Sequence, residues 1–279
     1  MSIPAKDWKS VWGLLTSGIH EHVRKNGFTD VVLGLSGGMD SALVAALCVD
    51  ALGREHVHGV LMPSPWSSQG SITDSELLAA YLGIATFTVP IAPMMDAFEK
   101  ALAPAFAGKQ RDVTEENIQS RIRGVILMSF SNKFKWMLMA TGNKSELAAG
   151  YCTLYGDTCG SLAPIADLYK TEVYRLARWF NEREGKLVIP QAVFDKAPSA
   201  ELRPGQTDQD SLPAYDVLDS VLHALIEESK PAVDIELSGI SHEQVERVLE
   251  LVRRSAFKRL QTAPLLPVGM HAFGVHVHM

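Results

Sequence analysis

Short apolar runs alternate with longer helical patterns along the first half of the chain. Residues 30–35 are β-branched or apolar on both faces, which favours a buried parallel strand over a half-exposed one. Good helix-forming residues follow from about Asp40 and stop at Gly53, a residue typical of helix C-terminal caps. The pattern therefore predicts a strand, a short loop and a helix in direct succession.

The same alternation continues along the chain. Further strands are predicted at residues 56–62, 85–89 and 136–141, and helices at residues 6–25, 72–82, 114–135, 214–228, 242–253 and 256–261. Ser71 or Thr73 is expected to cap the helix over residues 72–82. This succession predicts an α/β fold, a doubly wound, mostly parallel sheet with helices on both faces. Residues 1–279 are expected to form a single domain that is mainly helical from about residue 186.

The loop between the first strand and its helix contains two glycines. Gly37 and Gly38 permit left-handed backbone angles and a close approach of main-chain amides to a ligand. Those amides and the positive end of the following helix favour an anion such as phosphate. A bare Gly-Gly turn also joins strands to helices in proteins that bind nothing there. Here Ser36, Asp40 and Ser41 add the hydroxyls and the carboxylate that polyphosphate and magnesium require, so the sequence predicts a binding loop.

Composition and charge narrow the classes of protein. The chain has 279 residues, of which 47% are hydrophobic. Its formal net charge of -6 argues against a nucleic-acid-binding protein, because binding to a phosphate backbone depends on clustered cations. Its three cysteines form no CxxC pair, so neither a disulfide framework nor a zinc site is indicated and a cytoplasmic location is expected. No apolar run approaches the roughly 20 residues of a membrane span, and charges near the N-terminus argue against a signal peptide. No membrane partner is expected.

The loop motif resembles that of a known superfamily. Its residues read Ser36-Gly-Gly-Met-Asp-Ser41, similar to the pyrophosphate loop of the ATP pyrophosphatases, the adenine nucleotide alpha-hydrolase-like superfamily. Blocks at residues 116–121, 141–146, 150–157, 164–170 and 198–210 resemble NAD synthetase of the ammonia-dependent type. That family adenylates the nicotinate carboxylate of deamido-NAD with ATP and magnesium, and ammonia then displaces AMP to give NAD. The resemblance extends from about residue 31 to 258, and it implies a homodimer.

The resemblance implies roles for individual residues. The positions that match the ATP-binding residues of the family are Ser36, Gly37, Gly38, Met39, Asp40, Ser41, Thr141, Lys170 and Ser199. Asp40 and Glu146 match its magnesium ligands, and Asp40, Lys170 and Ser199 are the candidate catalytic residues. Without the resemblance, Thr141 could equally cap a helix, Glu146 could lie on a solvated face, and Lys170 could be an ordinary first-turn lysine.

Five further positions match residues that bind deamido-NAD. They are Asn117, Arg121, Arg123, Asp157 and Lys258. The two arginines could equally form a solvated helix flank, Asp157 could belong to a Gly-Asp turn, and other nearby arginines could replace Lys258. In the family, the partner subunit completes this site, so the dimer is expected to be the active unit.

Several alternatives stay open at this stage. Glutamine-dependent relatives carry an additional amidase domain, for which the chain has no room, so free ammonia is the expected nitrogen source. The blocks around Asn143 and Ser199 resemble the longer enzymes, however, so a separate glutaminase partner remains an alternative, as does a non-catalytic nucleotide sensor. Residues 196–210 are predicted to form a lid. The histidines near the C-terminus, His271, His276 and His278, are interpreted as a terminal tail.

Overall fold

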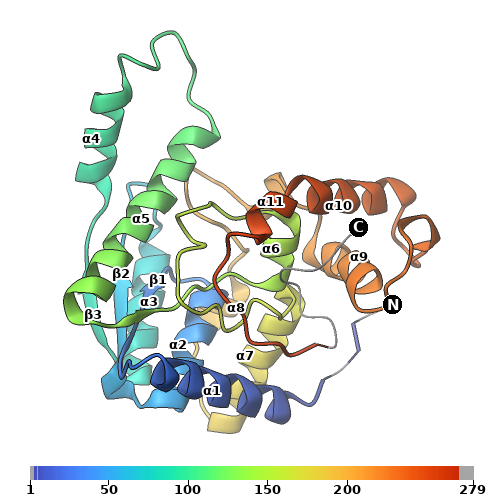
Figure 1. Cartoon of the computed structure of the whole chain (residues 1–279), viewed down its shortest axis with the longest axis horizontal. Helices are drawn as coiled ribbons and strands as arrows, with labels where there is room; N and C mark the ends of the chain where they lie inside the picture. Colours follow the sequence, from blue (N-terminus) through green and yellow to red (C-terminus); the bar gives the residue numbers. More distant parts are fainter. Residues whose placement is uncertain (1–2, 5, 270–279) are drawn as a thin grey trace.

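Four parallel strands form one sheet within the part of the chain described by the structure, a computed structural model that covers residues 3–4 and 6–269 (Figure 1). They are β1 (Val31–Leu35), β2 (Val57–Leu61), β3 (Ala85–Thr88) and β4 (Met137–Leu138). Their order across the sheet is β3-β2-β1-β4, and Val31 of β1 pairs with Val57 on one side and Met137 on the other. The predicted α/β class with a mostly parallel sheet is confirmed. The predicted histidine tail lies outside the described residues.

Helices pack on both faces of the sheet because alternate residues of each strand point to opposite sides. Val31, Leu33 and Leu35 join one core cluster, and Val32 joins another. The first cluster is built with α1 (Trp8–Lys25), α2 (Met39–Leu52), α3 (Gln69–Leu82) and α7 (Lys170–Glu184). The second is built with α4 (Ala92–Leu102) and α5 (Val113–Phe134), which together project from the molecule as an arm (Figure 1).

A separate core holds the mainly helical part of the chain against the sheet-containing part. This core includes residues of α6 (Lys144–Ala149), α9 (Tyr215–Ile226) and α10 (His242–Arg254). Helix α11 (Ala256–Arg259) contacts α6 and α10, whereas α8 (Gln191–Asp195) adds Val193 to the first cluster. On α10, Val245, Val248 and Val252 lie one helical turn apart and are fully buried, so one stripe of that helix faces α9 and α6. This packing places α9 directly behind α6 and α7, two helices that border the site described below.

Two local predictions were wrong, and some helices were not predicted. The predicted strand over residues 136–141 contributes only β4 to the sheet; the amide of Met139 still donates to the carbonyl oxygen of Val32 at 2.9 Å, but Met139 itself forms an isolated bridge with Leu162. Helix α3 starts earlier than predicted, and Ser68 is its N-cap, whose side chain accepts a hydrogen bond from the amide of Ser71. The helices α4, α6, α7 and α8 were not among those predicted. Among the described residues, no helix combines the length and apolarity that crossing a membrane requires.

Candidate active site

The predicted phosphate loop lies at the carboxyl end of β1, where parallel sheets commonly bind ligands. Gly37 has φ of 76°, and a side chain there would collide with the carbonyl oxygen of Ser71 at the start of α3. Ser36 Oγ accepts a hydrogen bond from the amide of Gly38 at 3.3 Å and lies 3.1 Å from Ser41 Oγ. Gly38 is the N-cap of α2 and offers no side-chain bond to it, so the first amides of α2 are left for a ligand.

A buried lysine joins two carboxylates beside this loop. Lys170, the first residue of α7, donates hydrogen bonds from Nζ to Asp40 on α2 and, at 3.0 Å, to Glu146 on α6. Asn143 Nδ2 donates to the other oxygen of Asp40 at 3.0 Å. Burial raises the pKa of Glu146 to about 8, although Lys170 opposes this effect. Burial alone would lower the pKa of Lys170, but the two carboxylates outweigh it and hold the pKa above its ordinary value.

Asp40 and Glu146 also provide carboxylate oxygens that suit a magnesium ion as ligands. Both carboxylates converge on a single cationic atom, and hard cations such as Mg²⁺ bind carboxylate oxygens. No group of three or more histidine, cysteine, aspartate or glutamate residues in the described part of the chain could hold a metal. Magnesium at nucleotide sites is typically held by one or two carboxylates together with substrate phosphates, so this pair fits that ion.

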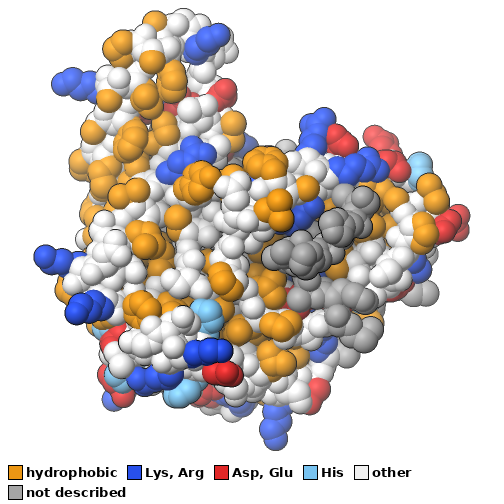
Figure 2. Space-filling view, viewed as in Figure 1, with side chains coloured by type: hydrophobic (Ala, Val, Ile, Leu, Met, Phe, Trp, Pro, Cys, Tyr) orange, Lys and Arg blue, Asp and Glu red, His pale blue; other side chains and the backbone are white. Residues whose placement is uncertain are grey.

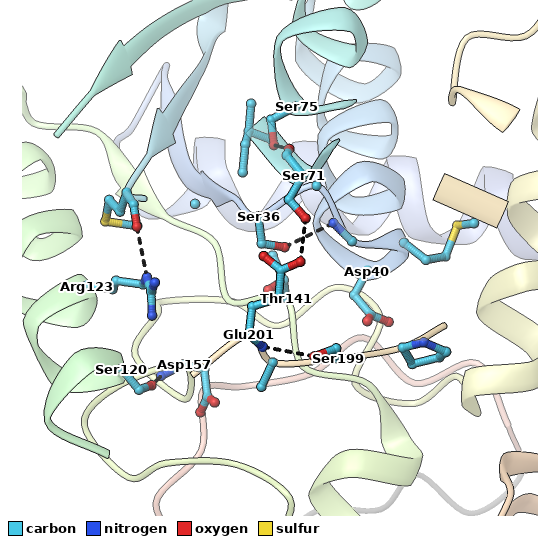
Figure 3. Close-up of a pocket in the computed structure, with 18 of the residues that line it drawn as sticks. Ser36, Asp40, Ser71, Ser75, Ser120, Arg123, Thr141, Asp157, Ser199 and Glu201 are labelled. Atoms are coloured by element: carbon cyan, nitrogen blue, oxygen red, sulfur yellow. Dashed lines mark hydrogen bonds between the residues drawn. The ribbon is translucent and has the colours of Figure 1, made fainter. Parts of the chain in front are cut away.

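A cavity of about 290 Å³ extends from the phosphate loop, Asp40, Glu146 and Lys170 to α5 (Figure 3). At that end Arg123 Nε donates to the carbonyl oxygen of Met62 at 3.1 Å, and burial lowers the pKa of Arg123 to about 10. The amide of Asp157 donates to Ser120 Oγ at 3.0 Å, and burial raises the pKa of Asp157 to about 6. A guanidinium and a carboxyl group therefore line one end of a cavity whose other end carries the phosphate loop.

Residues 196–202 border the cavity between α3 and α5. Glu201 Oε1 accepts hydrogen bonds from Ser71 Oγ at 2.8 Å and from Lys196 Nζ at 2.6 Å (Figure 3). On the other side Gln119 Nε2 of α5 donates to the carbonyl oxygen of Leu202 at 2.7 Å. Ser199 also lines the cavity, and its hydroxyl donates to the carbonyl oxygen of Gln206 at 2.6 Å. The segment predicted to be a lid thus spans the cavity from one helix to another.

The structure brings together most of the residues that the sequence predicted for the site. Those that line the cavity are Ser36, Gly37, Gly38, Met39, Asp40, Arg123, Thr141, Glu146, Asp157, Lys170 and Ser199. Ser41 lies in the loop and lines the adjoining cavity of about 140 Å³.

Three predicted substrate residues are not among those lining the cavity; they contact residues 150–157, the segment that carries Asp157. The bonds run from Thr153 Oγ1 to Asn117 Oδ1 (2.7 Å), from Arg121 Nε to the carbonyl oxygen of Leu154 (3.2 Å), and from Lys258 Nζ to the carbonyl oxygens of Gly150 and Cys152 (2.7 Å each). In this structure they support the segment beside the cavity.

Sequence reasoning missed several polar residues of the site. Asn143 had a recognisable signal, because Asn-x-x-Glu is a capping-box pattern and Asn143 is the N-cap of α6. Lys196 and Glu201 fell inside the predicted lid but were given no role. Asp208 also lines the cavity and accepts a hydrogen bond from Tyr215 Oη at 2.7 Å. No local pattern marks these last three, and Lys196 and Glu201 both bond the hydroxyl of Ser71, which is 125 and 130 residues away in the sequence.

Fold and site together define a class of protein: an α/β protein in which a glycine-containing loop, predicted to bind phosphate, lies beside two carboxylates and a lysine. The sequence model of the NAD synthase family matches residues 11–262. The chain therefore belongs to the NAD synthase family.

Individual relatives agree with this membership. The glutamine-dependent NAD(+) synthetase of Thermotoga maritima is 50% identical over 272 residues, which are 98% of this chain and 47% of that protein. Among solved structures, the chain is similar to the glutamine-dependent NAD+ synthetase from Acinetobacter baumannii in complex with adenosine diphosphate. The two sequences are 41% identical, and the match has a TM-score of 0.68 and covers 98% of this chain and 49% of that chain. The NH3-dependent NAD synthetase from Campylobacter jejuni is 31% identical, with a TM-score of 0.72 over 91% of this chain and 96% of that chain. The chain spans about half the length of the curated relatives it matches.

Proposed function

We propose that the chain catalyses the synthesis of NAD by amidating deamido-NAD. In this reaction a nicotinate carboxylate oxygen attacks the α-phosphorus of ATP, the bond to the β-phosphate breaks, and pyrophosphate leaves. Ammonia then attacks the acyl carbon of the adenylate, loses a proton, and AMP departs. The observation that carries the proposal is a single cavity with the phosphate loop, Asp40, Glu146 and Lys170 at one end and Arg123 with Asp157 at the other.

The proposed first step depends mainly on stabilising negative charge. The transferred phosphorus is surrounded by anionic oxygens, so amides and cations lower the barrier more than any protein nucleophile would. The loop amides and the N-terminus of α2 would bind the departing pyrophosphate, and the Lys170 ammonium would neutralise the phosphates beside it. Asp40 and Glu146 would hold Mg²⁺, which supplies further charge neutralisation when bound. Ser199 and Thr141, which line the same cavity, would also contact the nucleotide.

The second substrate would occupy the opposite end of the cavity. The Arg123 guanidinium would pair with an anionic group of deamido-NAD, and Asp157 would lie near the nicotinate ring. Asn117, Arg121 and Lys258 would contribute indirectly, by fixing residues 150–157, unless a partner subunit brings the dinucleotide to them.

The proposed function is tested by following all the products of one reaction mixture. Purified chain is mixed with ATP, Mg²⁺, deamido-NAD and ammonium, and pyrophosphate, AMP and NAD are quantified. We expect the three to appear in equal amounts, because each adenylation releases one pyrophosphate and each amidation one AMP. Binding of ATP without pyrophosphate release, in the presence of both other substrates, would instead favour the non-catalytic sensor.

The source of ammonia is a finer part of the proposal. We infer that the chain uses free ammonia, and its similarity over 96% of the NH3-dependent NAD synthetase from Campylobacter jejuni supports this proposal. Its similarity to glutamine-dependent enzymes favours the alternative of a separate glutaminase partner. Comparing ammonium with glutamine as the nitrogen source decides between them. NAD formed with ammonium alone supports free ammonia, and NAD formed only when glutamine and a glutaminase are both present supports the partner.

Neither a nucleic acid nor a membrane is a proposed partner of the chain. We propose that the chain acts in the cytoplasm, and its three free cysteines agree with that reducing compartment.

We also propose that the active unit is a homodimer formed through the arm of α4 and α5 and the neighbouring edge strand β3. Large apolar side chains are exposed there, as the orange surface of the arm shows in Figure 2. They are Phe87 (38% exposed), Phe98 (48%), Val125 (67%), Met128 (38%) and Phe134 (48%). An extended apolar surface of this kind typically marks a protein interface, and the site resembles one that a second copy completes.

Replacing Val125 with glutamate is expected to convert the dimer to a monomer. A charge at the centre of an apolar interface loses its hydration without gaining a partner, which costs several kcal/mol of association free energy. Molar mass would be measured by sedimentation over a range of concentrations. Val233→Glu provides a matched control, because Val233 is also highly exposed but lies away from the arm. A wild-type chain that is monomeric at all concentrations would contradict the proposed dimer.

A further inference from the structure

Asp219 on α9 is a buried carboxylate that the proposed mechanism does not use. Only 1% of its surface is exposed, and it is not among the residues that line the cavity. Its Oδ1 accepts a hydrogen bond from Ser145 Oγ at 2.5 Å, and its Oδ2 accepts one from the amide of Thr171 at 2.9 Å. One side chain from the helical part of the molecule therefore contacts both α6 and α7.

Ser145 extends this connection by one bond. Its hydroxyl oxygen accepts a hydrogen bond from the amide of Lys170 at 2.8 Å while its proton is donated to Asp219. The first two amides of α7 are thereby satisfied, one by the carboxylate and one through the serine. A carboxylate at this position also interacts favourably with the positive end of the helix.

The two bonded elements carry the charged groups of the site. Ser145 immediately precedes Glu146 on α6, and Thr171 immediately follows Lys170 on α7. Glu146 and Lys170 meet at 3.0 Å although they belong to different helices and are 24 residues apart in the sequence. Their relative placement therefore depends on what holds α6 against the N-terminus of α7.

We infer that Asp219 is a positioning residue, which acts through Ser145 to align Glu146 and Lys170 beside Asp40. The inference rests on the proposed function, because it assigns Asp219 to the same reaction. Asp219 touches neither substrate nor metal; it fixes the distance between two helices whose side chains do. Misplacement of reacting groups by about 1 Å can lower a rate by about 100-fold, so this alignment affects turnover more than substrate binding.

The test compares Asp219→Asn, Ser145→Ala and the double variant. Asparagine keeps the size of Asp219 but replaces one acceptor oxygen with a donor, so either the Ser145 hydroxyl or the Thr171 amide loses its acceptor. We expect kcat for pyrophosphate release to fall by about 10- to 100-fold in each single variant, and the KM for deamido-NAD to stay within about twofold. The double variant should lose no more than the worse single variant, because both changes remove the same connection.

Two matched variants separate positioning from general stability. Asp216→Asn changes an exposed carboxylate on the same helix, and Val221→Ala removes buried apolar atoms from it. Tm is measured for all variants, and kcat is compared well below each Tm. Val221→Ala should lower Tm while leaving kcat near wild type, and Asp216→Asn should leave both unchanged. An equal loss of kcat in Val221→Ala and Asp219→Asn at similar Tm would overturn the inference.

A readout independent of turnover completes the design. Affinity for ATP with Mg²⁺ is measured by calorimetry, and amide hydrogen exchange is followed at Lys170 and Thr171. Both amides should exchange faster in Asp219→Asn, and ATP with Mg²⁺ should bind more weakly, but neither change should occur in Val221→Ala. If the wild-type chain releases no pyrophosphate, the proposed function fails while these measurements still decide whether Asp219 aligns the two helices. If Asp219→Asn does not fold, Ser145→Ala gives the same comparison, and unchanged kcat and exchange in that variant would overturn the inference.

Discussion

Replacing Asp40 with asparagine is expected to lower pyrophosphate release by about 1,000-fold or more. Asparagine has nearly the same shape, so the loop and the start of α2 can keep their geometry. The change removes the carboxylate charge of Asp40. This carboxylate pairs with the Lys170 ammonium, and we propose that it is a magnesium ligand. Removal of one electrostatic group that acts on a transition state typically costs about 100- to 1,000-fold, and loss of a metal ligand adds to this cost.

The measurement is the rate of pyrophosphate release at saturating deamido-NAD and ammonium over a range of Mg²⁺ concentrations. Asp50→Asn is a suitable control, because Asp50 lies at the far end of the same helix and is not among the residues lining the cavity. Wild-type rates in Asp40→Asn, at any Mg²⁺ concentration, would contradict the role assigned to this carboxylate.

Replacing Lys170 with methionine is expected to abolish activity and to make stability depend on Mg²⁺. Methionine fills a similar volume but leaves Asp40 and Glu146 facing each other without their shared cation. Removing one member of a buried ion pair typically costs about 3–5 kcal/mol of folding free energy. Because the same two carboxylates are the proposed metal ligands, millimolar Mg²⁺ should recover part of this loss by binding the folded state.

Urea unfolding with and without Mg²⁺ measures both effects, and pyrophosphate release measures the activity. Lys9→Met on the exposed side of α1 serves as the control and should show neither the loss of stability nor the dependence on Mg²⁺. A Lys170→Met variant that is as stable as wild type in the absence of Mg²⁺ would show that the two carboxylates do not need the ammonium.

The regular elements around the phosphate loop could be predicted because local sequence determines them. The apolar run of β1 is buried on both faces, and Gly53 ends α2 where the helical pattern stops. The fourth strand was overestimated because residues 139–141 are apolar or small like a strand, yet their course is set by the bridge from Met139 to Leu162. Pairing with a segment more than twenty residues away leaves no mark on the local pattern.

The residues of the site also differ in whether local sequence was enough to predict them. Gly-Gly flanked by serines and Asp40 indicated phosphate binding from chemistry alone, whereas Glu146 and Lys170 were identified only through the family resemblance. Glu201 and Asp219 could not be found from the sequence, because their partners Ser71 and Ser145 are 130 and 74 residues away. Side chains that act by connecting elements become visible only when those elements are placed in space.

The absence of a side chain at Gly37 lets the predicted phosphate loop pack directly against the start of α3. The loop rests directly against the backbone of Ser71, and the Ser71 hydroxyl donates to Glu201 in the segment beside the cavity. Helix α3 is therefore a common support for the predicted phosphate loop and for residues 196–202. A ligand that shifts this support from one side changes affinity on the other, and thermodynamic reciprocity requires the two changes to be equal in free energy.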